Sequence, residues 1–279
     1  MEFQLELFEN NENEENKYPD YRIKQLTHGE ALIQFGTKTQ VLTDFFEKEE
    51  NVPTIYFTDG SSLRGNEYTV LSAMPALYDK NNLQEWDWKD VNLSKESQGV
   101  RPHLKTDSIQ YNVIQTLVRQ DDDIVYDDDN AGEIADVITL KLVENEIHVE
   151  LYHLKFAHEG KITSQIVNFY EVCGQAQKSA NWKYKEPEEM LNHLLRREVK
   201  KNNNGDECSR IYKGTHDKLV ELMKLAKRKL PVKYSVFIVQ PGVSKDTASD
   251  EILSLLGVTE SFLKDRTGIE LKVIVNKRD

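Results

Sequence analysis

The strongest constraint on the fold is a pair of consecutive strand-like segments, GEIADVITLKLVENEIHVELYHLKF, over residues 132–156. Apolar residues alternate in both halves and a polar turn near Glu144–Glu146 separates them, which predicts an antiparallel hairpin. Alternate residues of a strand share a face, so His153 and Lys155 extend the apolar face of the second strand to its rim. The hairpin places Asp136 of the first strand opposite residues near 153–155. An acid and a lysine therefore meet at one end of an apolar sheet.

Two interpretations of this meeting stand side by side. A buried or half-buried ion pair is the plain one, although desolvation makes such a pair a poor stabiliser. A metal and phosphodiester site is the functional one. Magnesium binds a few hard oxygens and can activate a bound water, while a nearby lysine orients that water or neutralises developing charge.

The segments around the hairpin predict an α/β fold, a mixed sheet with flanking helices. The spacing of DSIQYNVIQTLVRQ predicts an amphipathic helix capped by Asp107 or Ser108, and DIVYD predicts a short strand. After the hairpin we expect helices in SQIVNFYEVCGQAQKSA, EPEEMLNHLLRREVKK and THDKLVELMKLAKRKL. A strand in YSVFIVQPG stopped by Pro-Gly, short helices in ASDEILSLLG and TESFLKDR, and a closing strand in IELKVIVN complete the order.

Composition and turn-forming residues divide the chain into three parts. We expect a disordered acidic tail over residues 1–20, because ENNENEENKYPD is polar and acidic. Residues 21–100 are expected to form a smaller α+β accessory domain, with strands in EALIQFG and TIYFTDG, a helix capped near Thr39 or Thr43, and a loop in TDGSSLRGNE. Residues 101–279 are expected to form the main domain. Trp86 and Trp88 alternate as on a strand and are interpreted as packing anchors.

Charge and cysteine content narrow the function classes. The 279 residues carry a formal net charge of −12, which argues against indiscriminate nucleic-acid binding. Residues 178–233 nevertheless carry 15 basic and 8 acidic side chains, so a locally positive surface can exist on an acidic protein. Cys173 and Cys208 lack CxxC spacing, so we expect free thiols in a reducing, cytoplasmic setting rather than disulfides or a zinc site. No apolar run is long enough to span a bilayer, and GxSxG and P-loop motifs are absent from the sequence.

The motif GEIAD, followed by ELYHLK, resembles the PD-(D/E)xK nuclease superfamily, the restriction-endonuclease-like fold. The downstream FYEVCGQAQKSA resembles the glutamine-bearing helix that follows the lysine strand in several branches of that superfamily. The phrase VFIVQPGVSK with ILSLLG resembles the tail of nuclease modules attached to superfamily-2 helicases in bacterial defence systems. The core resemblance covers roughly residues 105–180.

The resemblance assigns roles to individual residues. Asp136 matches the metal-binding aspartate, Lys155 the catalytic lysine and Gln175 the helix glutamine, while His153 stands where the superfamily usually has Glu or Asp. Because imidazole suits softer metals than magnesium, Glu133, or Asp128 or Asp129 of the preceding loop, is expected to supply the missing carboxylate. Glu150 ranks lower because it lies on the other strand face. A solvated helix residue is the plain interpretation of Gln175.

Basic side chains supply candidate contacts to a nucleic-acid backbone. These are Lys178, one turn beyond Gln175, and Arg196, Arg197, Lys227 and Arg228 on the two later helices. The run KLAKRKLPVK is most often a solvated face, and it becomes a DNA contact if it borders the Asp136–Lys155 groove. The run DDDIVYDDDN lacks the ligand spacing of an EF-hand, so we expect most of its carboxylates to be solvated, with one or two leaning into the site.

These observations predict a Mg²⁺- or Mn²⁺-dependent DNA endonuclease, the nuclease component of an anti-phage defence assembly. Expected partners are DNA and a helicase or another defence protein, not a membrane, and self-association into a homo-oligomer is a further partner hypothesis. The alternative is a catalytically silent nuclease-fold module that binds nucleic acid or a helicase, and the histidine at position 153 is its best support. A purely structural scaffold has little support beyond the acidity of the chain.

Overall fold

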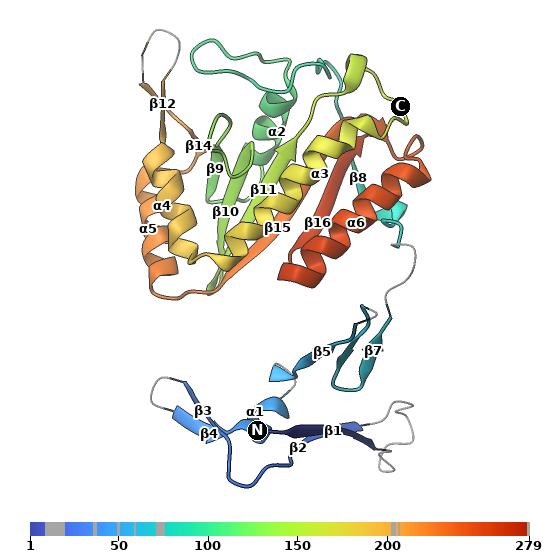
Figure 1. The fold of residues 1–279 in the computed structure, drawn as a ribbon. Helices are drawn as coiled ribbons and strands as arrows, with labels where there is room; N and C mark the ends of the chain where they lie inside the picture. Colours follow the sequence, from blue (N-terminus) through green and yellow to red (C-terminus); the bar gives the residue numbers. More distant parts are fainter. Residues whose placement is uncertain are drawn as a thin grey trace. The chain divides into compact units, whose positions relative to one another are not determined.

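The chain forms two compact units, Met1–Met74 and Pro75–Asp279 (Figure 1). The structure is a computed structural model. It describes residues 1–8, 20–35, 38–48, 51–58, 60–70, 76–201, 205 and 207–277.

The first unit consists of short antiparallel strands and one short helix. β1 pairs with β2, β3 pairs with β4, and β5, β6 and β7 form a three-stranded sheet. The bounds are β1 Phe3–Phe8, β2 Asp20–Gln25, β3 Leu32–Phe35, β4 Lys38–Val41, α1 Leu42–Phe46, β5 Thr54–Tyr56, β6 Ser62–Arg64 and β7 Glu67–Thr69.

Several expectations for this unit need correction. The start of the expected disordered tail is strand β1, which pairs with β2, whereas residues 9–19 lie outside the described residues. The expected helix begins at Leu42, and its N-cap is Val41 without a side-chain bond, because the preceding residues pair as β4. The expected loop contains strand β6 and the start of β7, and the chain turns between them at Gly65.

The second unit is built on a seven-stranded mixed sheet in the order β14-β9-β10-β11-β15-β16-β8. β14, β9, β10 and β11 are antiparallel neighbours, and β11, β15, β16 and β8 run parallel. The bounds are β8 Leu83–Trp86, β9 Ile124–Asp127, β10 Val137–Val143, β11 Glu146–Leu154, β14 Ile211–Lys213, β15 Val232–Ser244 and β16 Glu270–Asn276. A separate pair joins β12 Val199–Lys201 to β13 Glu207–Ser209.

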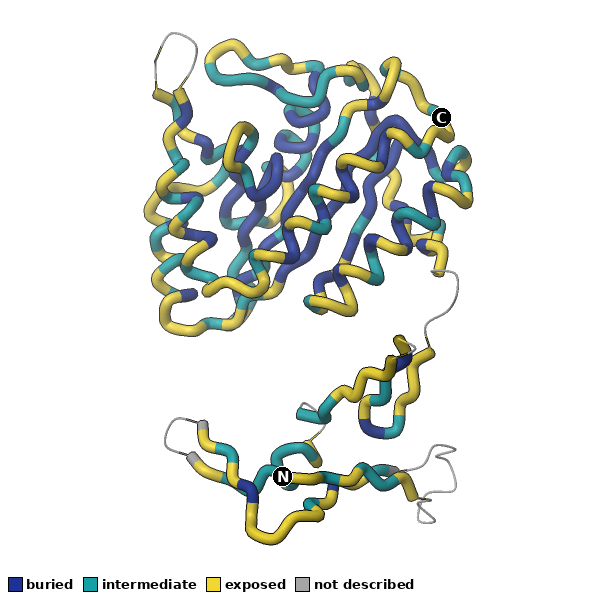
Figure 2. Tube along the Cα trace, viewed as in Figure 1, coloured by how far each residue is buried: buried dark blue, intermediate teal, exposed yellow. Residues whose placement is uncertain are grey.

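Helices cover both faces of this sheet. Its central strands are accordingly buried, dark blue in Figure 2. The larger core lies between one face and α3, α4, α5 and α6, and the smaller core lies between the other face and α2. The bounds are α2 Ile109–Val118, α3 Val167–Ser179, α4 Pro187–Arg197, α5 His216–Lys227 and α6 Asp250–Thr267, with 3-10 turns at Lys80–Asn82, His158–Gly160 and Ala180–Tyr184. The expected mixed α/β architecture with flanking helices is confirmed.

The central hairpin has the register that the alternation predicted. Val143 pairs with Glu146 at the turn and Val137 pairs with Tyr152 at the open end. Asp136, one residue before β10, therefore falls opposite His153. Buried Ile138 and Leu151 belong to the larger core, on the side of α3.

The second unit begins earlier than the sequence indicated. We expected the main domain to start at residue 101, but β8 pairs in parallel with β16 as the edge of the large sheet. Trp88 is buried in the smaller core, and its Nε1 donates to the carbonyl of Val275 at 3.2 Å. Residues after Pro75 therefore belong to the sheet unit and not to an accessory domain.

Two chain-breaking signals were overridden by tertiary contacts. β15 continues through Pro241 and Gly242, where its pairing with β16 is irregular and the side chain of Gln240 accepts a bond from the Gly242 amide at 2.8 Å. The two expected short helices are one helix, α6, which passes through Gly257. A Cβ at Gly257 would lie 1.9 Å from the carbonyl oxygen of Ala76, so glycine is required by close backbone approach.

In the described part of the chain, no helix combines the length and the apolar character needed to cross a membrane.

Candidate active site

Asp136 lies at the open end of the hairpin, and the backbone of β11 holds its carboxylate. Its Oδ2 accepts a hydrogen bond from the Leu154 amide at 2.8 Å. The residue is buried, at 7% relative exposure. Burial raises the pKa of this carboxyl well above its usual range, the bond from Leu154 opposes the rise, and the negative charge of Glu133 adds to it. A buried carboxyl of this kind is stabilised by a cation.

Asp129 and Glu133 complete a group of three carboxylates with Asp136. One oxygen of each lies within 4.8 Å of the others. Asp129 and Glu133 are half-buried, and the pKa of Glu133 is raised by burial, in spite of a backbone hydrogen bond from Asn130, and further by the charge of Asp129. Glu133 and Asp129, two of the three residues expected to supply the carboxylate that His153 lacks, thus lie beside Asp136.

The loop that carries Asp129 is fixed by buried ionic contacts. Asp128 is fully buried, accepts the Ile134 amide at 2.7 Å and pairs with Arg197 at 2.7 Å. Asp127, also buried, pairs with Lys200 at 3.3 Å. The Arg210 guanidinium donates to the carbonyls of Asp127 and Asp129. The expectation that most of these carboxylates are solvated is wrong for Asp127 and Asp128, which anchor the loop from inside. Asp121 is exposed, and Asp129 lies in the carboxylate group, as expected for one or two members of the run.

Lys155 follows β11 directly and is held between two glutamates. Its Nζ lies 2.9 Å from an oxygen of Glu171 on α3 and 3.4 Å from an oxygen of Glu96. Burial alone would lower the pKa of Lys155, but the hydrogen bond that its ammonium donates to Glu171 and the charge of Glu96 outweigh it and raise that pKa. The lysine is therefore a permanent cation at neutral pH. Among the described residues Lys155 forms no ion pair with Asp136.

His153 is a neutral core histidine and does not join the carboxylates. Its Nε2 lies 2.6 Å from the hydroxyl of Ser179 on α3, and the side chain is buried. Burial, with a smaller contribution from Lys178, lowers the pKa of His153 to about 3. The expected metal-ligand role of His153 finds no geometric support among the described residues, since its Nε2 is bonded to Ser179 on α3 and the residue is not in the carboxylate group.

Gln175 and Lys178 lie on α3, with Gln175 one turn beyond Glu171. Residues four apart share a helix face, so Gln175 points to the same side as Glu171. Its buried Oε1 has no hydrogen-bond partner in the described part of the protein. An orphan acceptor calls for an explanation, and a bound ligand is one. Lys178 is exposed and close enough to His153 to affect its pKa.

The remaining basic candidates separate into two groups. Arg197 is used internally, because its guanidinium also donates to the carbonyls of Asp128 and Ala131, whereas Arg196 is exposed at the same end of α4. Lys227 and Arg228 are exposed at the end of α5, shortly before β15 begins opposite Ile147. Since Lys155 follows the other end of β11, these two residues lie at the far end of the sheet from the carboxylates.

No role was predicted for the segment Leu93–Gln98, which contacts Lys155 and the loop that carries Asp129. Glu96 binds Lys155, the Ser97 hydroxyl donates to Asp129 at 2.5 Å, and the Gln98 amide group donates to Asp127 at 3.3 Å. Gln110, buried in α2, donates to Asp127 at 3.0 Å. The clustering of Glu, Ser and Gln before a capped helix was the only available signal, and it is weak.

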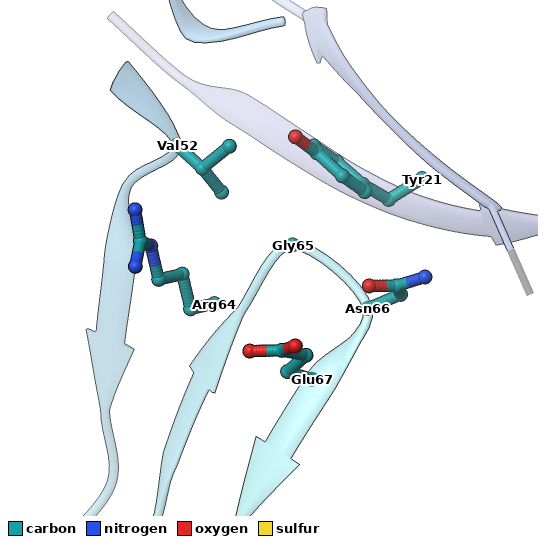
Figure 3. A pocket seen from close by; sticks show the side chains of 6 residues that line it. All are labelled: Tyr21, Val52, Arg64, Gly65, Asn66 and Glu67. Carbon is teal, nitrogen blue, oxygen red and sulfur yellow. The ribbon is translucent and has the colours of Figure 1, made fainter. Parts of the chain in front are cut away.

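A separate cavity of about 210 Å³ lies in the first unit (Figure 3). The ring of Tyr21 packs over Gly65, where a Cβ would lie 2.8 Å from the ring carbon Cε1. Its lining residues are Tyr21, Val52, Arg64, Gly65, Asn66 and Glu67. This cavity is not part of the carboxylate site.

The site combines chemically complementary groups on a rigid frame. Three carboxylates are the hard oxygen donors that Mg²⁺ and related ions prefer, and a cation bound among them would offset their mutual repulsion. A permanent cation, Lys155, follows the strand whose Leu154 amide binds Asp136. Together these groups can hold a divalent cation and attract an anionic oxygen.

Comparison of the chain with protein-family models, curated proteins and solved structures gave no match.

Proposed function

We propose that the chain is a metal-dependent deoxyribonuclease of the restriction-endonuclease-like fold that hydrolyses phosphodiester bonds within DNA. The observation that carries the proposal is the group Asp129, Glu133 and Asp136, joined through Leu154 to the lysine strand. An acid at the end of one central strand and a lysine at the end of the next is the arrangement that the sequence resemblance implies. The finer fold assignment rests on the same resemblance.

The carboxylates Asp136, Glu133 and Asp129 would hold Mg²⁺ or Mn²⁺. When bound, that ion would polarise the phosphoryl group and lower the pKa of a coordinated water. Lys155 would donate to a phosphate oxygen and neutralise charge that develops there, which its raised pKa favours over a role as a base. Gln175 would orient the substrate or a water through its free acceptor.

The biological setting is proposed from the sequence resemblance alone. The module resembles nucleases attached to superfamily-2 helicases of bacterial defence systems, so we infer that it works in the cytoplasm with a helicase or another defence protein. Lys178 and Arg196 are exposed on helices that border the carboxylate end of the sheet, which makes them our proposed backbone contacts. Lys227 and Arg228 are proposed only for a DNA path that reaches the opposite end.

Plasmid cleavage tests the proposal. The purified chain is incubated with supercoiled plasmid and Mg²⁺ or Mn²⁺, alongside Asp136→Ala and Lys155→Ala. We expect nicking or linearisation that requires the metal and is lost in both variants. Cleavage that persists unchanged in both variants would refute the site assignment.

A catalytically silent nuclease-fold module is the second candidate. The neutral His153, whose Nε2 is bonded to Ser179, favours it, because an imidazole stands where the superfamily usually has a carboxylate. In that case the chain binds DNA or its helicase partner, and cleavage is absent with every metal, both alone and with the partner present.

A further inference from the structure

Lys155 lies among several carboxylates, although a lysine that binds a phosphate requires none. Two glutamates contact its ammonium group, and its side chain is only 14% exposed. With Asp129, Glu133 and Asp136 nearby, the free site is strongly acidic, which opposes the approach of a polyanion. At least one of these contacts must therefore change when a phosphate reaches the lysine.

Glu96 is the fixed arm of this arrangement. The same oxygen, Oε2, accepts both the Phe156 amide at 2.9 Å and the Lys155 ammonium at 3.4 Å. Its own carbonyl accepts the Gln110 amide at 3.0 Å, so α2 holds its backbone. The side chain is 29% exposed. A carboxylate with a charge-assisted bond to the lysine strand cannot leave without freeing that amide.

Glu171 is the loose arm. Its side chain is 62% exposed, and in the described part of the chain its ion pair with Lys155 is the one that its carboxylate makes. Exposed ion pairs contribute little to stability, so exchanging this one for another anion costs little. The Glu171 oxygen, 2.9 Å from Nζ, occupies a position that a phosphate oxygen could take with the same geometry.

We propose that the two carboxylates on Lys155 have different roles, with Glu96 positioning the lysine and Glu171 standing in for a substrate phosphate until nucleic acid displaces it. The inference rests on the proposed function and adds a regulation to the same site. Glu171 competes with small anions for Lys155. A phosphodiester chain that also binds elsewhere on the protein displaces Glu171 from the lysine. Glu96 remains on Lys155 throughout.

Two isosteric variants test the proposal, Glu96→Gln and Glu171→Gln, because glutamine keeps an acceptor for the Phe156 amide and a comparable helix propensity. Glu159→Gln is the matched control. Glu159 is an exposed glutamate between β11 and α3, its carboxylate lies 3.9 Å from the ammonium of Lys161, and it does not contact Lys155. Binding of labelled single-stranded and duplex oligonucleotides is measured by anisotropy with Ca²⁺ in place of Mg²⁺. Cleavage is measured with Mg²⁺ or Mn²⁺, and the melting temperature of each variant verifies folding.

Glu171→Gln is expected to bind DNA roughly 1.5- to fivefold more tightly, the range that one exposed ion pair allows, with kcat preserved. Glu96→Gln is expected to lower kcat about 10- to 100-fold with binding unchanged, since the lysine loses its position but keeps its charge. Glu159→Gln should match the wild-type chain. Equal effects of Glu96→Gln and Glu171→Gln in a chain that cleaves DNA overturn the proposal and leave the nuclease function intact. A wild-type chain and a Glu171→Gln variant that neither bind nor cleave overturn both.

Discussion

Removing the charge of Asp136 should stabilise the metal-free protein, although the residue is central to the proposed site. Asp136→Asn keeps an oxygen that can accept the Leu154 amide, so the backbone contact survives the substitution. It removes a buried charge whose pKa is raised by burial and by neighbouring acids. Functional sites often carry such a cost in stability.

The magnitude follows from the spacing of the three carboxylates. At 4.8 Å, two unit charges repel by about 3.5 kcal/mol at an effective dielectric constant of about 20, and by about 1 kcal/mol in bulk water. Asp136 takes part in two of the three pairs. Part of this repulsion is avoided because Asp136 binds a proton readily, and the substitution weakens one hydrogen bond by about 1 kcal/mol. We expect a net gain of about 1–3 kcal/mol, or about 2–12 °C in Tm.

The sign with pH follows from the raised pKa. A carboxyl whose folded-state pKa exceeds its unfolded value favours folding at low pH, and this contribution is lost as the pH rises through the folded-state value. The advantage of Asp136→Asn is therefore largest under alkaline conditions and disappears in acid.

Thermal unfolding at pH 8 with EDTA, Mg²⁺ or Mn²⁺ measures the effect. Without metal the variant should melt above the wild-type chain, and metal should raise the Tm of the wild-type chain only. Asp121→Asn is the control, since its side chain is 99% exposed and the substitution should change neither quantity. A variant that melts below the wild type without metal, or one that keeps the metal-dependent rise, would refute the reasoning.

Three further substitutions follow from the same geometry. Lys155→Ala should lower kcat about 10²–10³-fold with an unchanged Tm. A marked fall in Tm together with the loss of kcat would instead assign the lysine a structural role. The pKa of His153 is lowered to about 3, so between pH 7.5 and 5.5 the histidine binds a proton only in the unfolded state. The free energy of unfolding of the wild-type chain, measured in urea, should therefore fall by about 1 kcal/mol over this range, and His153→Gln should remove that fall. An equal fall in the variant contradicts the prediction. Arg197→Ala leaves the fully buried Asp128 unpaired and should cost about 3–5 kcal/mol of unfolding free energy, against about 0.5 kcal/mol or less for the exposed Arg196→Ala. Similar losses for the two arginine variants would show that the Asp128 contact is not structural.

Local patterns predicted the central hairpin and most helices of the second unit, but they missed the short strands β12, β13 and β14. Alternation over β10 and β11 placed the hairpin turn and brought Asp136 to the end of β11, because a strand period of two leaves one register that buries the apolar set. Helical spacing placed α2, α3, α4 and α5, and of the two caps predicted for α2 the structure uses Ser108. Failures came where long-range packing overrode local signals, as at Gly257, which a neighbouring backbone requires.

What the sequence alone determined is the acid at the end of one central strand and the lysine at the end of the next. The tertiary structure decided which groups surround them. Glu96 and Glu171 reach Lys155 from segments far apart in the chain, and no local period encodes such a meeting. Burial, which only the folded chain defines, made His153 neutral and raised the pKa of Asp136. Local periodicity fixes which face a side chain occupies, whereas its charge and its partners depend on what the rest of the chain packs against it.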